Sequence, residues 1–427
     1  MPVKPSRPTA APSLASREFR LLFTGATASK MGTQIGIVAI PFLATATLGV
    51  GPGQVGLLTM LSTVAFLLIG LPAGAWVDRL RRRNVQIVAD LSRAALIGSV
   101  PLAWAMDALT IEQLYVVVFL SGVAAVFFDV AAQSYLPYVV GPDALVPANA
   151  RLGSVDAASQ VAGRSLGGYL IEAFTAPGAL VVTAFGYLSS VACLGFITRR
   201  EPRPQRRSDA RLWREVREGA GFVLRHPILR PIAIAGAGTN FCVHMILTMV
   251  VVLFVHDLRV SAGVIGIFLA AGGAGVFLGA LTARRLAGRL GSGRTLWLVD
   301  LVLGPIAVLV PLVQRGPMLW LATAAWMVVT FRVGVTNVIQ ISLRQRMTPE
   351  RLLGRMNATM RWMLFGAVAL GAGTAGLVGE YFGPRASLWV GGVGLTLVWL
   401  PVFLSPLRGM REPDADSGAV RQGALSR

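Results

Sequence analysis

Residues 56–83 read GLLTMLSTVAFLLIGLPAGAWVDRLRRR, and this stretch decides the class of fold. Its first 22 residues carry no charge, whereas an aspartate and four arginines follow within the last six. The hydrocarbon core of a bilayer is about 30 Å thick, and a helix of roughly 20 apolar residues crosses it. Arginine is costly inside that core, so the basic run marks the point where the helix leaves it. The stretch therefore predicts a transmembrane helix that ends close to residue 77.

The same pattern recurs along the chain. Hydrophobic residues make up 54% of its 427 residues and charged residues only 14%, whereas a typical soluble domain is about 25% charged. Twelve apolar stretches have membrane length: 20–48, 56–77, 85–106, 112–134, 152–174, 178–198, 231–255, 263–283, 295–313, 317–341, 357–380 and 385–405. The predicted fold class is an all-α integral membrane protein with twelve transmembrane helices. The lipid bilayer is then its main partner, and we expect a monomer.

The loop arginines predict the orientation. A net charge of +19 is compatible with nucleic-acid binding, but the arginines lie between apolar stretches rather than along one face, so we expect no nucleic-acid partner. They gather in the even-numbered connections: Arg79, Arg81, Arg82 and Arg83; Arg151; residues 199–230; Arg284, Arg285, Arg289 and Arg294; Arg344, Arg346, Arg351 and Arg355. Cytoplasmic loops carry the excess of Lys and Arg. We therefore expect a multi-pass protein of the inner (plasma) membrane with both termini cytoplasmic.

Composition divides the chain into five parts. These are a disordered cytoplasmic tail (1–18), a six-helix half (19–198), a basic linker (199–230), a second six-helix half (231–406) and a cytoplasmic C-terminal tail (407–427). The linker contains ten arginines. Within residues 209–225, apolar residues recur among the charges at roughly helical spacing, which predicts an amphipathic helix on the cytoplasmic face.

Internal repeats indicate that the two halves are equivalent. The segment GLPAGAWVDR (70–79) has a similar counterpart about 205 residues later, GVFLGALTARR (275–285). Likewise, the segment LPYVVGPDALVPANA (136–150) corresponds to LRQRMTPERLLGRMNA (343–358) in the second half. Parallel repeats of this kind place a substrate site between the halves near mid-membrane.

Two six-helix halves, a long basic central loop and the segment Gly74-x-x-x-Asp78-Arg79-x-x-Arg82-Arg83 resemble the major facilitator superfamily. Residues 147–150 and 348–357 are similar to its drug-efflux branch, which contains macrolide exporters and enterobactin-type siderophore exporters. The resemblance covers residues 17–406. It implies proton-driven export of a bulky amphipathic small molecule.

The resemblance implies a gating motif, which consists of Gly74, Asp78, Arg79, Arg82 and Arg83. Asp78 is expected to bind the N–H groups at the start of a neighbouring helix and so hold the inward gate closed. The alternative is that the arginines act as topology determinants, and both roles are compatible.

The chain departs from the family pattern in four places. The gating segment has Arg81 where Gly is usual, and its second copy has Ala283 where Asp78 would correspond. The fifth apolar stretch reads Gly163-Arg164-Ser-Leu-Gly167-Gly168, with Arg in place of the Pro that many antiporters carry. The fourth lacks the arginine of many proton-coupled antiporters. These departures bear on proton coupling more than on the export fold.

Ionisable side chains at bilayer depth are candidate functional residues because burying them is costly. Lys30 and Arg164 each lie about 15–18 Å along their helices, and Arg332 is a third deep cation. Together with Gln34, Asn240 and Asn337 they form our predicted substrate cavity, able to accept an acidic group. The alternative is that each cation is locked in an ion pair between helices.

Asp129 and Asp156 are the candidates for proton coupling, which needs a carboxylate that exchanges a proton near neutrality. His244 is a further titratable group, although a lone intramembrane histidine is more often bonded to a neighbour. Asp90 and Arg93 lie on one helical face and are expected to pair locally. Glu172 and Glu380 lie near the periplasmic ends of their helices, where we expect water to solvate them.

The sequence predicts a secondary active exporter of small amphipathic molecules that works by proton antiport and alternating access. Its partners would be a small-molecule substrate and protons, with no cofactor and no metal. A lysophospholipid flippase and a transport-inactive membrane sensor remain the alternatives. An enzyme is not expected, because no nucleophile–base set appears, and the glycine-rich runs follow no strand and lack the Gly-Lys-Ser/Thr ending of a nucleotide site.

Overall fold

The computed structural model describes residues 14, 16–77, 79–141, 144–197 and 212–409, and every regular element in these ranges is helical. The first half contains α1 (Arg17–Phe42), α2 (Pro52–Val77), α3 (Arg82–Ala105), α4 (Ile111–Val140) and α5 (Leu145–Gly195). The second contains α7 (Leu229–Val252), α8 (Ala262–Leu290), α9 (Ser292–Leu303), α10 (Pro317–Arg346), α11 (Glu350–Phe382), α12 (Pro384–Leu395) and the short α13 (Leu400–Phe403). Short π or 3-10 turns extend several of them: η1 (Leu43–Thr47), η3 (Leu253–Asp257), η4 (Gly304–Leu309) and η5 (Pro406–Gly409).

Ten helices in the described ranges are long and apolar enough to cross a membrane. One of them, α5, is 51 residues long and consists of two helices, because Thr175 has φ 70° and ψ 168°. A positive φ interrupts the helix, and Pro177 then favours the start of the second arm. The two arms correspond to the predicted stretches 152–174 and 178–198. α1, which carries Lys30, is not among the ten but packs extensively on α5.

The regular elements of the described ranges are helices because the bilayer offers no water to backbone N–H and C=O groups. Each helix satisfies these groups within itself. Prolines occur inside α1, α2, α3 and α4 and are tolerated because neighbouring helices and local adjustments satisfy the freed carbonyls.

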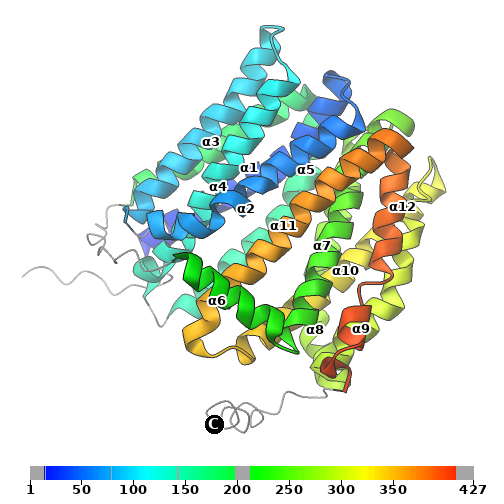
Figure 1. Cartoon of the computed structure of the whole chain (residues 1–427). Helices are drawn as coiled ribbons and strands as arrows, with labels where there is room; N and C mark the ends of the chain where they lie inside the picture. Colours follow the sequence, from blue (N-terminus) through cyan, green and yellow to red (C-terminus); the bar gives the residue numbers. More distant parts are fainter. Residues whose placement is uncertain (1–13, 15, 78, 142–143, 198–211, 410–427) are drawn as a thin grey trace, which may run out of the picture.

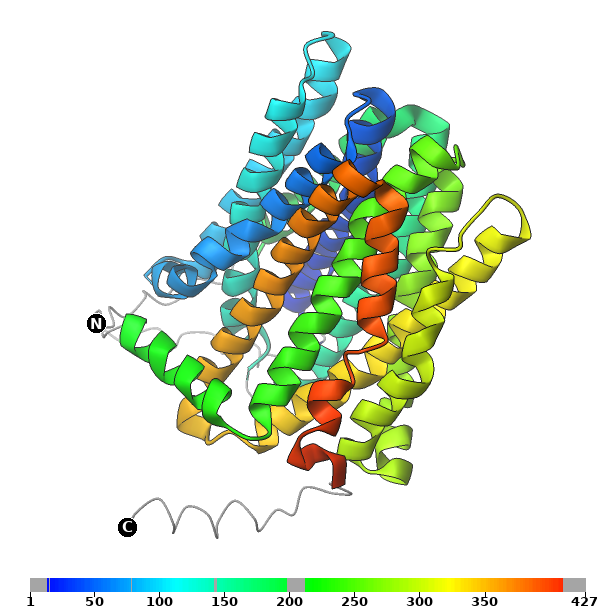
Figure 2. The same cartoon turned by 45° about the vertical axis from the view of Figure 1, so that its right-hand side comes forward.

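The two halves meet along two helix pairs, α2 with α11 and α5 with α8. A Cβ added to Gly56 of α2 would lie 2.3 Å from the Cα of Gly376 in α11. Likewise, a Cβ on Gly168 of α5 would lie 2.9 Å from the Cα of Gly266 in α8. Glycine is required at these crossings because the backbones approach too closely for any side chain. Figures 1 and 2 both show α2 running alongside α11.

The linker helix α6 (Leu212–Arg225) lies across one end of the bundle (Figure 2). It is the amphipathic helix that the sequence predicts within 209–225. Val223 is fully buried in a cluster with Met356 and Met360 of α11. Glu218 forms an ion pair with Arg355. α6 is therefore packed on the second half rather than only tethering the halves.

Candidate functional site

Polar side chains from five helices gather between the two halves. We call this group the central polar cluster: Lys30 and Gln34 of α1, Asp129 of α4, Asp156 and Arg164 of α5, His244 of α7, and Arg361 of α11. Both halves contribute, as expected for a site that is alternately exposed to the two sides of a membrane.

Lys30 and Asp156 form the closest pair in this cluster. The Lys30 Nζ lies 2.6 Å from Asp156 Oδ1, and the two side chains are 37% and 45% exposed. Gln160, one turn further along α5, donates to the other carboxylate oxygen at 3.4 Å. An ion pair this exposed stabilises the fold by no more than about 1 kcal/mol. Its groups are therefore available to exchange partners.

Arg164 connects three helices. Its Nε donates to Gln34 Oε1 on α1 at 3.0 Å, and its Nη1 donates to the carbonyl of Leu269 on α8 at 3.4 Å. A Cβ on the adjacent Gly163 would lie 2.7 Å from Gln34 Cβ. Close packing of α5 on α1 therefore holds the arginine against the opposite half. Arg164 thus lies at the interface between the halves, where the family pattern has a proline.

Asp129 lies beside the Lys30–Asp156 pair. Its side chain is exposed, and Lys30, Arg93 and Arg361 act on it electrostatically as cations, with Asp156 as a like charge. The two predicted coupling carboxylates are therefore neighbours. A proton gained by one changes the charge felt by the other and by Lys30.

Sequence reasoning missed Arg361. Its guanidinium lies 4.8 Å from the ring centroid of Phe66 on α2, and Phe66 stacks on Phe365 of α11 at 4.1 Å. The contact joins a cation of one half to an aromatic ring of the other. A charged residue inside the apolar stretch 357–380 was the available signal.

The helix α7 carries two of the titratable or polar residues singled out from the sequence, Asn240 and His244. His244 Nδ1 is 2.9 Å from the carbonyl oxygen of Asn240, and Asn240 Nδ2 donates to Gly236 at 2.9 Å. His244 also lies within electrostatic range of Arg164. The histidine is thus bonded to its own helix, the commoner arrangement for a lone intramembrane histidine.

Arg332 does not join the central polar cluster in this conformation. It is fully buried inside the second half, where Nη1 lies 3.0 Å from Asp300 Oδ1 and 3.4 Å from the carbonyl of Leu395. This is the ion-pair alternative left open by the sequence. Asn337, further along α10, is exposed and has no hydrogen-bond partner within the described part of the chain.

The first half has its own buried polar network. Arg93 Nη1 lies 3.1 Å from Asp90 Oδ1, which confirms the predicted local pair. Arg93 Nη2 also donates to Thr33 at 2.8 Å and to the hydroxyl of Tyr187 at 2.7 Å. The network joins α1, α3 and the second arm of α5. It links these three helices of the first half through buried hydrogen bonds.

The predicted gating segment lies at the end of α2, but Asp78 falls outside the described residues. Arg83 donates to the carbonyls of Leu194 and Gly195 at 2.7 and 2.6 Å, and so caps the C-terminus of α5. Arg79 is exposed, and a Cβ on Gly74 would meet no atom within 4 Å. Arg82 is partly exposed at the first residue of α3.

Hydrogen bonds join the halves at the side of the odd-numbered connections. Glu380 accepts from the N–H of Gly53 at 2.9 Å, and Glu172 accepts from the N–H of Gly263 at 3.0 Å. Both glycines lie in the first turn of a helix, where N–H groups lack helical partners and favour a negative charge. Near them, His256 Nε2 lies 3.3 Å from the carbonyl of Thr45. Both glutamates are exposed, as expected, but each also contacts the opposite half.

Two helical halves that meet at glycine crossings and enclose a shared polar cluster define a membrane transporter. The chain belongs to the Major Facilitator Superfamily, whose model matches residues 22–372. It is a multi-pass inner-membrane transporter and not an enzyme.

Curated relatives are exporters. The chain is 29% identical to the enterobactin exporter EntS of Citrobacter koseri, over 84% of this chain and 85% of that protein. It is 27% identical to the multidrug efflux pump Tap of Mycolicibacterium fortuitum, over 93% and 97% of the two chains. The similarity to these exporters supports efflux transport by this protein.

Solved structures share the fold. The nucleoside transporter NupG superposes with a TM-score of 0.74 at 11% identity, over 91% of this chain and 99% of that one. A bacterial homologue of the iron transporter ferroportin, in an inward-facing state, gives 0.69 at 18% identity, over 90% and 99%. At these identities the likeness concerns the fold alone.

Proposed function

We propose that this protein is a secondary active exporter that exchanges protons for small amphipathic molecules with an acidic group. The observation that carries the proposal is the exposed Lys30–Asp156 pair in the first half, with Asp129 beside it and Arg361 reaching in from the second half. An acidic group can replace Asp156 as the partner of Lys30, because the pair is half exposed. The exporters among the relatives support the same direction of transport.

The aromatic part of the cluster supports an amphipathic cargo. Phe66 and Phe365 stack across the boundary between the halves, next to the guanidinium of Arg361. Planar apolar groups pack well on such rings. A cargo bound there would contact both halves, so its contacts would change when the halves rotate relative to each other.

The carboxylates give a route to proton coupling. A charged Asp129 or Asp156 accepts hydrogen bonds from hydroxyl or amine groups of the cargo, whereas a protonated carboxyl has lost that charge. The acidic group of the cargo pairs with Lys30, whereas proton and cargo compete at Asp129 when its carboxylate accepts a hydrogen bond from a hydroxyl or amine group of the cargo. Competition of this kind produces exchange, because a carrier loaded with one has reduced affinity for the other.

In this proposal the observed conformation faces the cytoplasm. The hydrogen bonds of Glu172 and Glu380 join the halves at the odd-numbered connections, which the arginine distribution places at the periplasm. Rocking of the halves would break these contacts and form others near the gating segment. Both termini are cytoplasmic in the same arrangement.

The test is expression in a strain that lacks its own pumps, with cellular accumulation followed for antibiotics and siderophores of different charge. We expect lower accumulation of acidic amphipathic compounds, and restored accumulation after a protonophore. Unchanged accumulation of every compound, together with altered lysophospholipid movement, would replace the exporter by the flippase alternative. Efflux that persists with the protonophore would remove proton coupling.

A further inference from the structure

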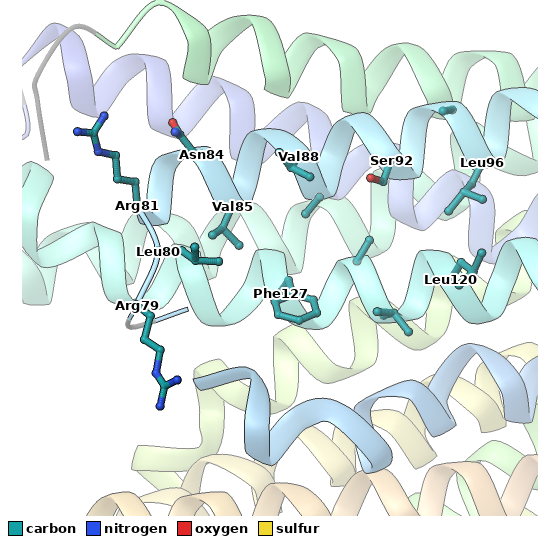
Figure 3. Close-up of a pocket in the computed structure, with 14 residues that line it drawn as sticks. Arg79, Leu80, Arg81, Asn84, Val85, Val88, Ser92, Leu96, Leu120 and Phe127 are labelled. Atoms are coloured by element: carbon teal, nitrogen blue, oxygen red, sulfur yellow. The ribbon is translucent and has the colours of Figure 1, made fainter. Parts of the chain in front are cut away.

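A groove of about 940 Å³ runs along α3 and α4 of the first half (Figure 3). Its α3 wall includes Val88, Ser92 and Leu96, and its α4 wall includes Leu120 and Phe127. Apart from its end and Ser92, the lining is apolar. The groove is separate from the central polar cluster, because Lys30, Asp129, Asp156 and Arg361 do not line it.

The groove lies on the outer face of the first half. Figure 1 shows α3 at the edge of the molecule, away from the helices of the second half. Asp90 and Arg93 lie on the opposite side of α3, buried against α1 and α5. Val88, by contrast, is 62% exposed. A membrane-spanning helix at this place presents its exposed apolar side to lipid.

Polarity changes along the groove. One end is formed by Arg79, Arg81 and Asn84, as Figure 3 shows, and the apolar residues follow from there. The 15 residue-to-residue steps from Arg81 to Leu96 correspond to about 22 Å of helix. That length matches one leaflet, since a bilayer is about 40–45 Å thick with its headgroups. The groove therefore has the charge pattern and the length of one phospholipid molecule.

We propose that this groove binds one anionic phospholipid of the leaflet next to Arg81, with its phosphate on the Arg81 guanidinium and an acyl chain along α3. A guanidinium donates paired hydrogen bonds to phosphate oxygens, and Asn84 adds an amide donor. Arg81 stands where the family signature usually has glycine, so the headgroup contact is a feature of this chain. The anionic surface of the cytoplasmic leaflet supplies the ligand. The inference does not depend on the proposed cargo.

The test uses the purified full-length protein in detergent and follows thermal unfolding as phosphatidylglycerol or phosphatidylcholine with identical chains is added. We expect phosphatidylglycerol to raise the midpoint and phosphatidylcholine to act only at about tenfold higher concentration, because the trimethylammonium group of phosphatidylcholine cancels the phosphate charge and is repelled by arginine. Arg81→Gln should remove most of this difference. Arg289→Gln, an exposed arginine of the second half, should leave it unchanged.

The proposed position of the acyl chain along α3 is tested with variants whose larger side chains fill the groove. Ser92→Trp should abolish the response to phosphatidylglycerol, whereas Leu102→Trp, at a 67% exposed position of the same helix outside the groove, should retain it. Each variant is first compared with wild type without lipid, by gel filtration and unfolding midpoint. If Ser92→Trp does not fold, Val88→Phe takes its place. Equal effects of the two lipids on wild type, or equal losses in Arg81→Gln and Arg289→Gln, would overturn the proposal.

Discussion

Glu172 and Glu380 occupy equivalent places in the two halves, and each accepts a hydrogen bond from a helix of the opposite half. The donors are Gly263 N–H at 3.0 Å and Gly53 N–H at 2.9 Å. The nearby glycine crossings repeat the same symmetry, with Gly168 on Gly266 and Gly376 on Gly56. The observed conformation is therefore held at one face by two copies of one contact.

The double variant Glu172→Ala/Glu380→Ala should shift the protein towards the conformation in which this face is open. Each carboxylate caps a helix, but both are exposed, so we expect about 1 kcal/mol for the two together and about a fivefold change in populations. Spin labels on cysteines at Met106 and Met318, with Cys193 and Cys242 replaced by serine, would report the distance between halves. An unchanged distance distribution would show that the contacts do not hold the face closed.

Lys30→Ala and Arg361→Ala should reduce export of acidic compounds more than export of neutral ones. A hydrogen bond to a charged group contributes about 1.5–3 kcal/mol, which corresponds to a loss of about tenfold or more for the acidic cargo. Uptake into inverted vesicles, with one acidic and one neutral compound of similar size, measures the ratio. Arg289→Ala, at an exposed position in the last turn of α8, serves as the control. Equal losses for both cargoes would assign the two cations to structural pairing.

Asp129→Asn should abolish the response of transport to a pH gradient while cargo still exchanges across the membrane. The amide keeps the size of the side chain but cannot gain or lose the proton. Proteoliposomes with and without an imposed gradient separate driven transport from passive exchange. Asp257→Asn, at an exposed aspartate of η3, is the matched control. Gradient-driven transport that survives in Asp129→Asn would leave Asp156 as the coupling candidate.

Arg332→Ala should destabilise the protein without a specific effect on any cargo. Removal of one partner leaves Asp300 as an uncompensated buried charge, which costs about 3–5 kcal/mol. Lys30→Ala, which breaks a half-exposed pair, should cost less than about 1 kcal/mol. Unfolding midpoints in detergent compare the two variants. An Arg332→Ala protein with the stability of wild type and a selective loss of acidic cargo would return Arg332 to the substrate site.

His226 makes stability depend on pH. Its Nδ1 accepts from the N–H groups of Ile228 and Leu229 at 3.2 and 3.3 Å, next to the start of α7. Burial lowers the pKa of His226 below its ordinary value of 6.5. The unfolded chain therefore binds the proton more readily, so this contribution is complete above about pH 6.5 and is lost as the pH falls below it.

His226→Asn keeps a side-chain acceptor at this position but cannot titrate. We expect its unfolding midpoint to fall less than that of wild type between about pH 7.5 and pH 5.5. Other titrating groups are common to both proteins, so the difference isolates His226. Parallel curves would show that the histidine does not contribute.

The sequence by itself determined the helices, their order and the two-half architecture. In a bilayer each backbone must bond within its own helix, so local composition places the apolar helices of residues 56–83 and of the other stretches. The arginines of residues 79–83 marked a helix end because arginine is costly inside the hydrocarbon core. The repeats around 70–79 and 275–285 then predicted halves that the fold confirms.

Only the tertiary structure decided which charges meet. Arg332 and Lys30 are both cations deep within apolar stretches, yet Arg332 pairs with Asp300 inside one half while Lys30 faces Asp156 and Asp129 between the halves. Glu172 and Glu380 likewise accept hydrogen bonds from N–H groups at helix N-termini of the opposite half. Such partners lie far apart in sequence, and they meet through the packing of whole helices, which depends on close glycine contacts and not on local composition.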